Sequence, residues 1–387
     1  MKRKLMIYDN NDIRNAYLNL LRAAIWDTAP VLDGTVDWNS LLCVADMQST
    51  LALICQSALQ VEGINAPSPE MRMTMLGIMG QKSSQNAFLN GIMKRAIGLI
   101  RAHGIEPVLL KGAGLALNYP IPEFRQCGDI DLFVCEENYH EGCAALREMT
   151  DFQNYGMEKK NEMHYNVVNG IVNIELHHVS AVLRDAKDYA FYLSVERKGL
   201  SENLRCVDID DMSVSLPSDT FNVFYVFHHA WGHFLEHTGV GFRQLCDWTL
   251  LLHSLFGKLN LEELKSDLEK LGLMNSWKTF GCIAVFTLGL PKEEMPFFDP
   301  SFEKNAFKVL EYVWKDGNFN GERKPFKNRK VNVFTRVENG LRTIFSDFEK
   351  LCCVSFGMAC RETAKKFRFY LRKVPRYLRG ELQQDVE

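Results

Sequence analysis

Two aspartates separated by one residue are the side chains of this sequence most suited to chemistry. Asp129 and Asp131 flank Ile130, and residues 130–134 are apolar enough to predict a β-strand. Because a strand alternates its side chains between two faces, both carboxylates are predicted to point the same way. Neighbouring carboxylates repel each other unless a cation lies between them, and hard oxygen ligands suit Mg²⁺. The pair therefore predicts a metal site.

A third carboxylate is predicted to come from a β-hairpin. Asn169 and Gly170 lie between two β-rich runs, and Asn-Gly at such a point favours a tight turn. In the second arm, Glu175 and His177 are predicted to share one face. Three carboxylates can hold two Mg²⁺ ions, one activating an attacking hydroxyl and the other steadying a leaving pyrophosphate. Glu175 is then the natural third ligand and a candidate acceptor for the hydroxyl proton.

A phosphate-binding turn is predicted shortly before the aspartates. Residues 108–110 predict a strand, residues 111–114 (Lys-Gly-Ala-Gly) a turn, and the residues after them the start of a helix. Glycines let the backbone approach an anion, the N-terminus of a helix attracts phosphate, and Lys111 adds positive charge. Arg125 has two open interpretations, a clamp on a triphosphate or an ordinary salt bridge.

Histidines and an arginine farther along the chain offer weaker signals. His229 and His233 lie one helical turn apart, a spacing that can bind zinc, but no third ligand has a convincing spacing, and Asp247 is the candidate. Packing, or the wall of an acceptor pocket, is the favoured interpretation of these histidines. Arg243 and Asp247 are also one turn apart and predict an ion pair within a helix.

The elements that must position these residues divide the chain into four regions. Apolar residues at helical spacing predict an N-terminal helical region over residues 1–104. The strand-like runs fall in residues 105–215. Helical patterns return over residues 216–320, and residues 321–387 predict a basic helical extension.

Composition restricts the class of protein. The chain has 387 residues, 47% apolar and 24% charged, with a net charge of −3, so it is neither a polyanion nor a polycation. Eleven cysteines without a CxxC pair favour free thiols in a reducing compartment. The N-terminus lacks the apolar run of a signal peptide, and the apolar stretches are too short to span a bilayer. We therefore expect a cytoplasmic protein.

The basic C-terminus raises the question of a charged partner. Residues 321–387 contain 16 lysines and arginines against 8 acidic residues, with aromatic residues among them. That mixture suits contact with nucleic acid or an anionic membrane surface. A solvated helical face with a buried aromatic side is the favoured interpretation.

The motifs together resemble the nucleotidyltransferase superfamily of the DNA polymerase beta type and, within it, an uncharacterised bacterial nucleotidyltransferase family. The superfamily pattern, an apolar residue, Gly, Gly or Ser, and later Asp-x-Asp, corresponds to residues 110–113 and 129–131, with Ala113 in place of the second Gly or Ser. The later Glu-Leu-His motif corresponds to residues 175–177. The resemblance implies an α+β fold, in which a small mixed β-sheet nucleotidyltransferase core is flanked by N-terminal and C-terminal helical regions.

The resemblance also implies a reaction and a set of site residues. A nucleoside monophosphate would pass from a nucleoside triphosphate, such as ATP, to an acceptor hydroxyl, with Mg²⁺ or Mn²⁺ as cofactor. The acceptor stays open among a small molecule, a sugar, a protein side chain and a nucleic acid end. The catalytic and metal-binding residues would be Asp129, Asp131 and Glu175, and the nucleotide would contact Lys111, Gly112, Ala113, Arg125 and His177.

Two other functions fit part of the pattern. Asp-x-Asp also resembles the metal motif of glycosyltransferases that use nucleotide sugars, although about 100 helical residues at the N-terminus do not fit that class. A catalytically degenerate member that binds nucleotide and acts as a regulator is the other alternative, and Ala113 is the residue that favours it.

Overall fold

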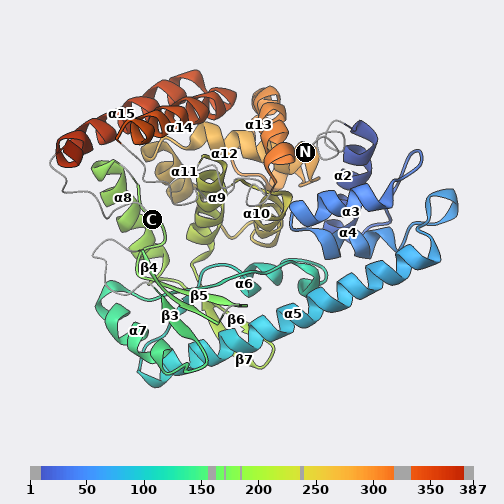
Figure 1. Cartoon of the computed structure of the whole chain (residues 1–387), viewed down its shortest axis with the longest axis horizontal. Helices are drawn as coiled ribbons and strands as arrows, with labels where there is room; N and C mark the ends of the chain where they lie inside the picture. Colours follow the sequence, from blue (N-terminus) through green and yellow to red (C-terminus); the bar gives the residue numbers. More distant parts are fainter. Residues whose placement is uncertain are drawn as a thin grey trace.

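The chain is described from a computed structural model, in residues 10–155, 163–169, 171–183, 185–235, 239–317 and 333–378. Within these residues the strands form one seven-stranded mixed sheet, surrounded by helices (Figure 1). The α+β class that the sequence predicts is therefore confirmed. The free thiols are confirmed as well, because all eleven cysteines lie in the described residues and none forms a disulfide.

The N-terminal region is helical, as its periodicity predicts. The longest helix, α5 (Pro69–Ala102), begins where the side chain of Ser68 accepts a hydrogen bond from the backbone N–H of Met71, with Pro69 at the first helical position. It ends before Gly104, whose φ of 77° suits glycine. The helices that precede α5 are α2 (Asn11–Trp26), α3 (Trp38–Met47) and α4 (Leu51–Ala58).

The sheet has the strand order β3-β4-β5-β2-β1-β7-β6. Strand β2 pairs in parallel with β5 and antiparallel with β1, while β1 pairs in parallel with β7. β2 is thus an inner strand, with neighbours from both directions along the chain. The strands are β1 (Val108–Leu109), β2 (Ile130–Phe133), β3 (Gln153–Tyr155), β4 (His164–Val168), β5 (Asn173–His177), β6 (Arg205–Ile209) and β7 (Met212–Leu216).

The predicted hairpin is present as the antiparallel pair β4 and β5. At its turn, the side-chain oxygen of Asn169 accepts hydrogen bonds from the backbone N–H groups of Ile171 and Val172. Gly170, the other half of the predicted turn signal, lies outside the described residues. The pairing fixes which side chains of the two arms share a face.

Helices cover both faces of the sheet. The C-terminal half of α5 and helix α7 (Tyr139–Arg147) bury the face that carries the apolar residues Ile130, Leu132 and Ile174. Figure 1 shows α5 running along this side of the sheet. The opposite face meets α9 (Asp219–Leu235) and α10 (Phe242–Ser254), whose residues line a cavity with residues of the sheet. The short helix α6 (Ala113–Ala116) follows β1 and packs against the cores of both faces. Polar residues that alternate with the apolar ones therefore point toward α9 and α10.

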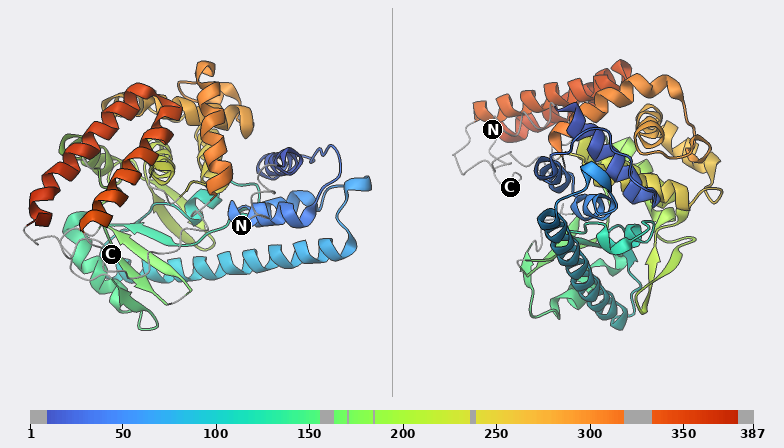
Figure 2. Two further views of the ribbon diagram at one scale, coloured as in Figure 1. Left: turned by 45° about the horizontal axis from the view of Figure 1, so that its top comes forward. Right: turned by 90° about the vertical axis from the view of Figure 1, so that its right-hand side faces the viewer.

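The remaining helices pack around α9 and α10. Figure 2 shows α14 and α15 as an antiparallel pair at the edge of the protein. Among the described residues, no helix combines the length and apolarity needed to cross a membrane. The helices are α8 (Ala186–Gly199), α11 (Leu261–Lys270), α12 (Met274–Cys282) with a π-helical turn at Ile283–Thr287, α13 (Glu303–Asp316), α14 (Val333–Val354) and α15 (Phe356–Leu378). Short 3-10 turns lie at Gly63–Asn65, Pro122–Phe124, Glu136–Asn138, Lys292–Glu294 and Pro300–Phe302.

Candidate active site

The three predicted carboxylates converge on one face of the sheet. Asp131 on β2 is the direct partner of Glu175 on β5, because the two strands are parallel and in this register. Asp129 lies immediately before β2 rather than within it, but its carboxylate still joins the other two. One ligand oxygen from each of the three residues lies within 4.8 Å of the others. We call Asp129, Asp131 and Glu175 the acidic cluster.

The pKa values within the acidic cluster are shifted in opposite directions. Burial and then the charge of Asp131 raise the pKa of Asp129. Burial alone would also raise the pKa of Asp131, which is 2% exposed, but Lys111 and His177 lower it well below its usual range. The neighbouring carboxylates therefore compete for positive charge. A divalent cation between the oxygens would relieve this competition, so the donor set fits Mg²⁺.

Lys111 and Gly112 follow β1 at the edge of the acidic cluster. The ammonium of Lys111 lies 3.1 Å from Oδ1 of Asp131 and 3.0 Å from Nε2 of His229. Gly112 has φ 64° and ψ −121°, a conformation that residues with a Cβ rarely adopt. The predicted helix does start at Ala113, but it is only four residues long. Its dipole is small, so Lys111 is the main positive charge at this turn.

Arg125 forms the salt bridge that was one of its two predicted roles. Its Nε and Nη2 donate to the two carboxylate oxygens of Asp247 at 2.8 and 2.7 Å. The hydroxyl of Tyr119 donates to the same carboxylate at 2.8 Å. All three side chains are buried. The alternative role of Arg125, as a clamp on a triphosphate, stays a prediction.

The predicted ion pair between Arg243 and Asp247 is corrected by the structure. Asp247 turns away from its own helix toward Arg125, and Arg243 instead donates from Nη1 to the backbone carbonyl of Gln126 at 3.2 Å. The Nε atom of Arg243 is buried and has no hydrogen-bond partner among the described residues. Arg243 therefore brings a guanidinium with unused donors to the site.

A cavity of about 270 Å³ joins these groups. The acidic cluster and Lys111 line it from the sheet, and His229, His233 and Arg243 line it from α9 and α10. Burial, and then the charge of Lys111, lower the pKa of His229 well below its usual value and that of His233 to about 4. Both imidazoles are thus neutral at pH 7. The location fits the predicted pocket wall.

Zinc binding by these histidines gains no support from the geometry. Their Nε2 atoms lie 3.2 Å apart, but Asp247, the third ligand considered, is bonded to Arg125. Among the described residues, two groups of three side chains converge as metal ligands could, the acidic cluster and the group of His164, Glu175 and His177. Neither of them includes His229 or His233.

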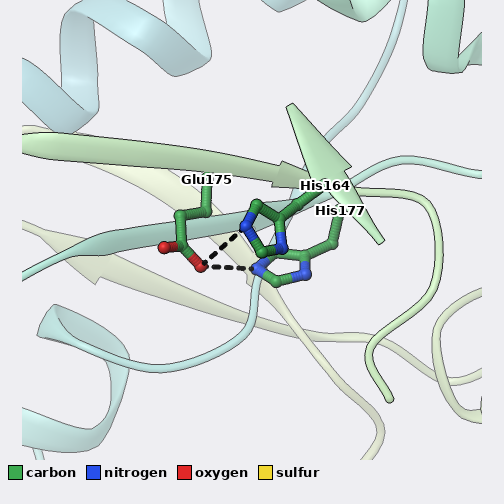
Figure 3. Close-up of side chains that lie close together, drawn as sticks. All are labelled: His164, Glu175 and His177. Atoms are coloured by element: carbon green, nitrogen blue, oxygen red, sulfur yellow. Dashed lines mark ion pairs between the residues drawn. The ribbon is translucent and has the colours of Figure 1, made fainter. Parts of the chain in front are cut away.

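His177 lies among the carboxylates, on the face that the alternation of β5 predicts. Its Nε2 atom is 3.2 Å from Oδ1 of Asp131 and 3.4 Å from Oε2 of Glu175. Burial would lower its pKa, but hydrogen bonding to these two carboxylates raises the pKa to about 9. His164 of the neighbouring strand lies beside it (Figure 3). Contact between His177 and the nucleotide stays a prediction.

Two functional candidates escaped the sequence reasoning. Arg243 was interpreted only as an ion-pair partner, and nothing local in its sequence indicates that it faces a cavity. His164 had a usable signal, because a hairpin turning at residues 169–172 brings residues 164 and 177 opposite each other. Following the hairpin register outward from the turn would have found it.

The fold and the acidic cluster agree with the class that the motifs resemble, and comparison with known families identifies it. A family described as "Uncharacterised nucleotidyltransferase" matches residues 34–285, which include the acidic cluster and the residues that line the cavity. The chain belongs to this family and is a nucleotidyltransferase. A search of curated proteins and a search of solved structures each found no match.

Proposed function

We propose that the protein transfers a nucleoside monophosphate from a nucleoside triphosphate to an acceptor hydroxyl, with Mg²⁺ as cofactor and Mn²⁺ as its substitute. The observation that carries this proposal is the composition of the cavity. Three carboxylates line one part of it, and the cations Lys111 and Arg243 lie close by. Side chains that can bind a metal ion and side chains that can bind phosphate thus line the same cavity. A reaction between a metal-bound triphosphate and an acceptor requires this arrangement.

The residues of the chain divide the work between the two substrates. The acidic cluster would hold the divalent cations, which neutralise the triphosphate and activate the acceptor hydroxyl when bound. Lys111 and the unused donors of Arg243 would bind phosphate oxygens, and Gly112 lets the backbone approach them. His177 would hold the carboxylates of Asp131 and Glu175 in place.

The proposed step is an in-line displacement at the α-phosphorus. The acceptor oxygen forms a bond to the α-phosphorus, and the bond from this phosphorus to the oxygen of the leaving pyrophosphate breaks. The hydroxyl proton passes to Glu175, which is our candidate for the base. Negative charge builds up on the pyrophosphate, where Lys111 and Arg243 stabilise it.

The cavity bears on how the regions work together. Its sheet residues belong to the region 105–215 that we assign as the catalytic core, whereas His229, His233 and Arg243 belong to the region 216–320. We propose that the second region completes the nucleotide site of the first, with residues 1–104 supporting the sheet. The basic extension, residues 321–387, would be a further helical part, which packs on the region 216–320 through residues such as Leu351 and Ala359.

Labelled nucleotides test the reaction. The full-length protein is incubated with MgCl₂, a cell extract as the source of acceptors, and a nucleoside triphosphate labelled at either the α- or the γ-phosphate. We expect the α label, but not the γ label, to appear on an acceptor, together with release of pyrophosphate. Transfer of the γ label would indicate a kinase and refute the proposal, and binding without pyrophosphate release would favour the regulator.

Matched variants connect the labelling to the acidic cluster. The double variant Asp129→Asn/Asp131→Asn should abolish labelling because it removes two metal ligands. Asp211→Asn makes the same chemical change at a side chain that is 86% exposed and pairs with Lys94, so it should label like the wild type. Labelling by the double variant at the wild-type level would show that the reaction occurs elsewhere.

A further inference from the structure

A second group of potential metal ligands lies beside the acidic cluster and shares one residue with it. His164 on β4 and His177 on β5 are direct partners across the antiparallel pair. Glu175, two residues before His177, points to the same face because strand side chains alternate. The rings of the two histidines have centroids 4.9 Å apart. The register of the hairpin therefore places two imidazoles and one carboxylate together. We call these three residues the histidine cluster.

The distances within the histidine cluster suit a small cation. Nε2 of His177 lies 3.4 Å, and Nε2 of His164 lies 3.9 Å, from the same oxygen of Glu175 (Figure 3). One donor atom from each residue lies within 4.8 Å of the others. Zinc binds nitrogen and oxygen at about 2.0–2.2 Å, so ligand atoms around a tetrahedral ion are separated by about 3.3–3.6 Å. Charge-assisted hydrogen bonds are shorter, at about 2.7–2.9 Å, so the distances of 3.4 and 3.9 Å match ligands around a shared ion better than direct hydrogen bonds.

The donor atoms also separate this group from the acidic cluster by chemistry. Two imidazoles and a carboxylate are a donor set that suits zinc, nickel and copper, whereas Mg²⁺ and Mn²⁺ prefer oxygen ligands. Glu175 is suited to the shared position, since Nδ2 of Asn173 holds its Oε1 at 2.7 Å and its Oε2 faces the histidines. We propose that His164, Glu175 and His177 bind a second divalent cation of the zinc type, which displaces the proton that Nε2 of His177 otherwise shares with Asp131 and Glu175.

The competing explanation is a plain network of hydrogen bonds. Nε2 of His177 also lies 3.2 Å from Oδ1 of Asp131, so an imidazolium shared between carboxylates fits part of the arrangement. That explanation needs only Asp131, Glu175 and His177 around the carboxylates, and His164 adds an ion pair to Glu175 at 3.9 Å. His164 therefore decides between the two, and its replacement leaves all three carboxylates of the acidic cluster in place. The inference does not rest on the proposed transfer reaction.

Zinc binding to the metal-free, full-length protein provides the test. Titration with ZnCl₂ in the absence of nucleotide, read against a competing chelator, gives the affinity. We expect His164→Gln to weaken Zn²⁺ binding at least about tenfold. Asp129→Asn changes the acidic cluster only and should bind Zn²⁺ nearly as well as the wild type. His140→Gln, at an exposed histidine, should also leave the affinity unchanged.

A second ion and a second observable keep the test decisive. Mn²⁺ binding, followed by electron paramagnetic resonance, reports on the acidic cluster, so His164→Gln should retain it and thereby show that the variant is folded. Co²⁺ in place of Zn²⁺ should give a d–d absorption band in the wild type that His164→Gln loses. Zn²⁺ affinity unchanged by His164→Gln, or lost to the same extent in Asp129→Asn, would overturn the proposal.

Discussion

Replacing Asp247 by asparagine should destabilise the protein strongly, because it removes the counter-charge of a buried arginine. Arg125 and Asp247 are 2% and 3% exposed and share two hydrogen bonds. The hydroxyl of Tyr119 donates to the same carboxylate. An asparagine side chain offers one acceptor oxygen, but its NH₂ group would face another donor. The guanidinium would then be buried without an anion.

The expected size of the effect follows from this burial. Breaking a buried ion pair by removing one partner costs about 3–5 kcal/mol, a large part of a typical unfolding free energy of about 5–15 kcal/mol. Burial would raise the pKa of Asp247, but the charge of Arg125 lowers it. The stabilisation is therefore complete above the unfolded carboxyl pKa of about 3.9 and is lost as the pH falls through the lower folded value.

Urea unfolding at pH 7, followed by circular dichroism, measures the loss. Asp211→Asn is the matched control, because the exposed pair of Asp211 with Lys94 should contribute almost nothing. The double variant Arg125→Met/Asp247→Leu should lose less than Asp247→Asn, since it leaves no unpaired charge. A loss below about 1 kcal/mol for Asp247→Asn would refute the reasoning, which depends on the guanidinium staying buried.

Three further changes test other parts of the structure. Gly112→Ala should lower the unfolding free energy by about 1–3 kcal/mol, because φ of 64° with ψ of −121° strains any residue with a Cβ. Gly128→Ala, with open space around it, should lower it less, and thermal unfolding of both variants measures the difference. Gly199→Ala should cost about 1–3 kcal/mol in the same assay, because its Cβ would overlap the side chain of Phe221. Burial, and then the charge of Glu263, raise the pKa of Asp267 to about 6. This carboxyl therefore lowers the stability of the folded state increasingly as the pH rises from the unfolded pKa, and fully above pH 6. Asp267→Asn should therefore stabilise the protein by up to about 3 kcal/mol at pH 8 and by little at pH 4, and equal effects in urea unfolding at the two values would contradict this.

The sequence predicted the parts of the site that depend on local pattern. Alternation along a strand is a short-range property, so it placed Asp131 on β2 and put Glu175 and His177 on one face. The N-terminal helical region followed from apolar residues at helical spacing, and α5 lies within it. Asp129 was predicted to lie on the same strand as Asp131, but β2 begins one residue after it, because a strand boundary is set by pairing with neighbours.

The sequence pattern could not predict contacts between residues that are far apart in the chain. The partner of Asp247 is 122 residues away, whereas the predicted partner, Arg243, is one helical turn away. Helical spacing shows which residues can meet on an isolated helix, but burial favours whichever charge gives the better geometry. Arg125 is the partner of Asp247 because its planar guanidinium donates to both oxygens of that carboxylate.

The order of the strands is what joins the separate motifs into one site. β5 runs parallel to β2, so Glu175 lies beside Asp131 in register. β1 runs antiparallel on the other side of β2, so the chain leaves β1 at the end where β2 begins. The backbone N–H of Leu110 donates to the carbonyl of Asp131 at 3.0 Å, and Lys111 follows directly. If β1 did not pair with β2, or paired with it in the parallel direction, the same motifs would be present but the lysine and the carboxylates would not meet. The chemistry proposed for this protein therefore depends as much on the topology of the sheet as on the residues that the motifs contain.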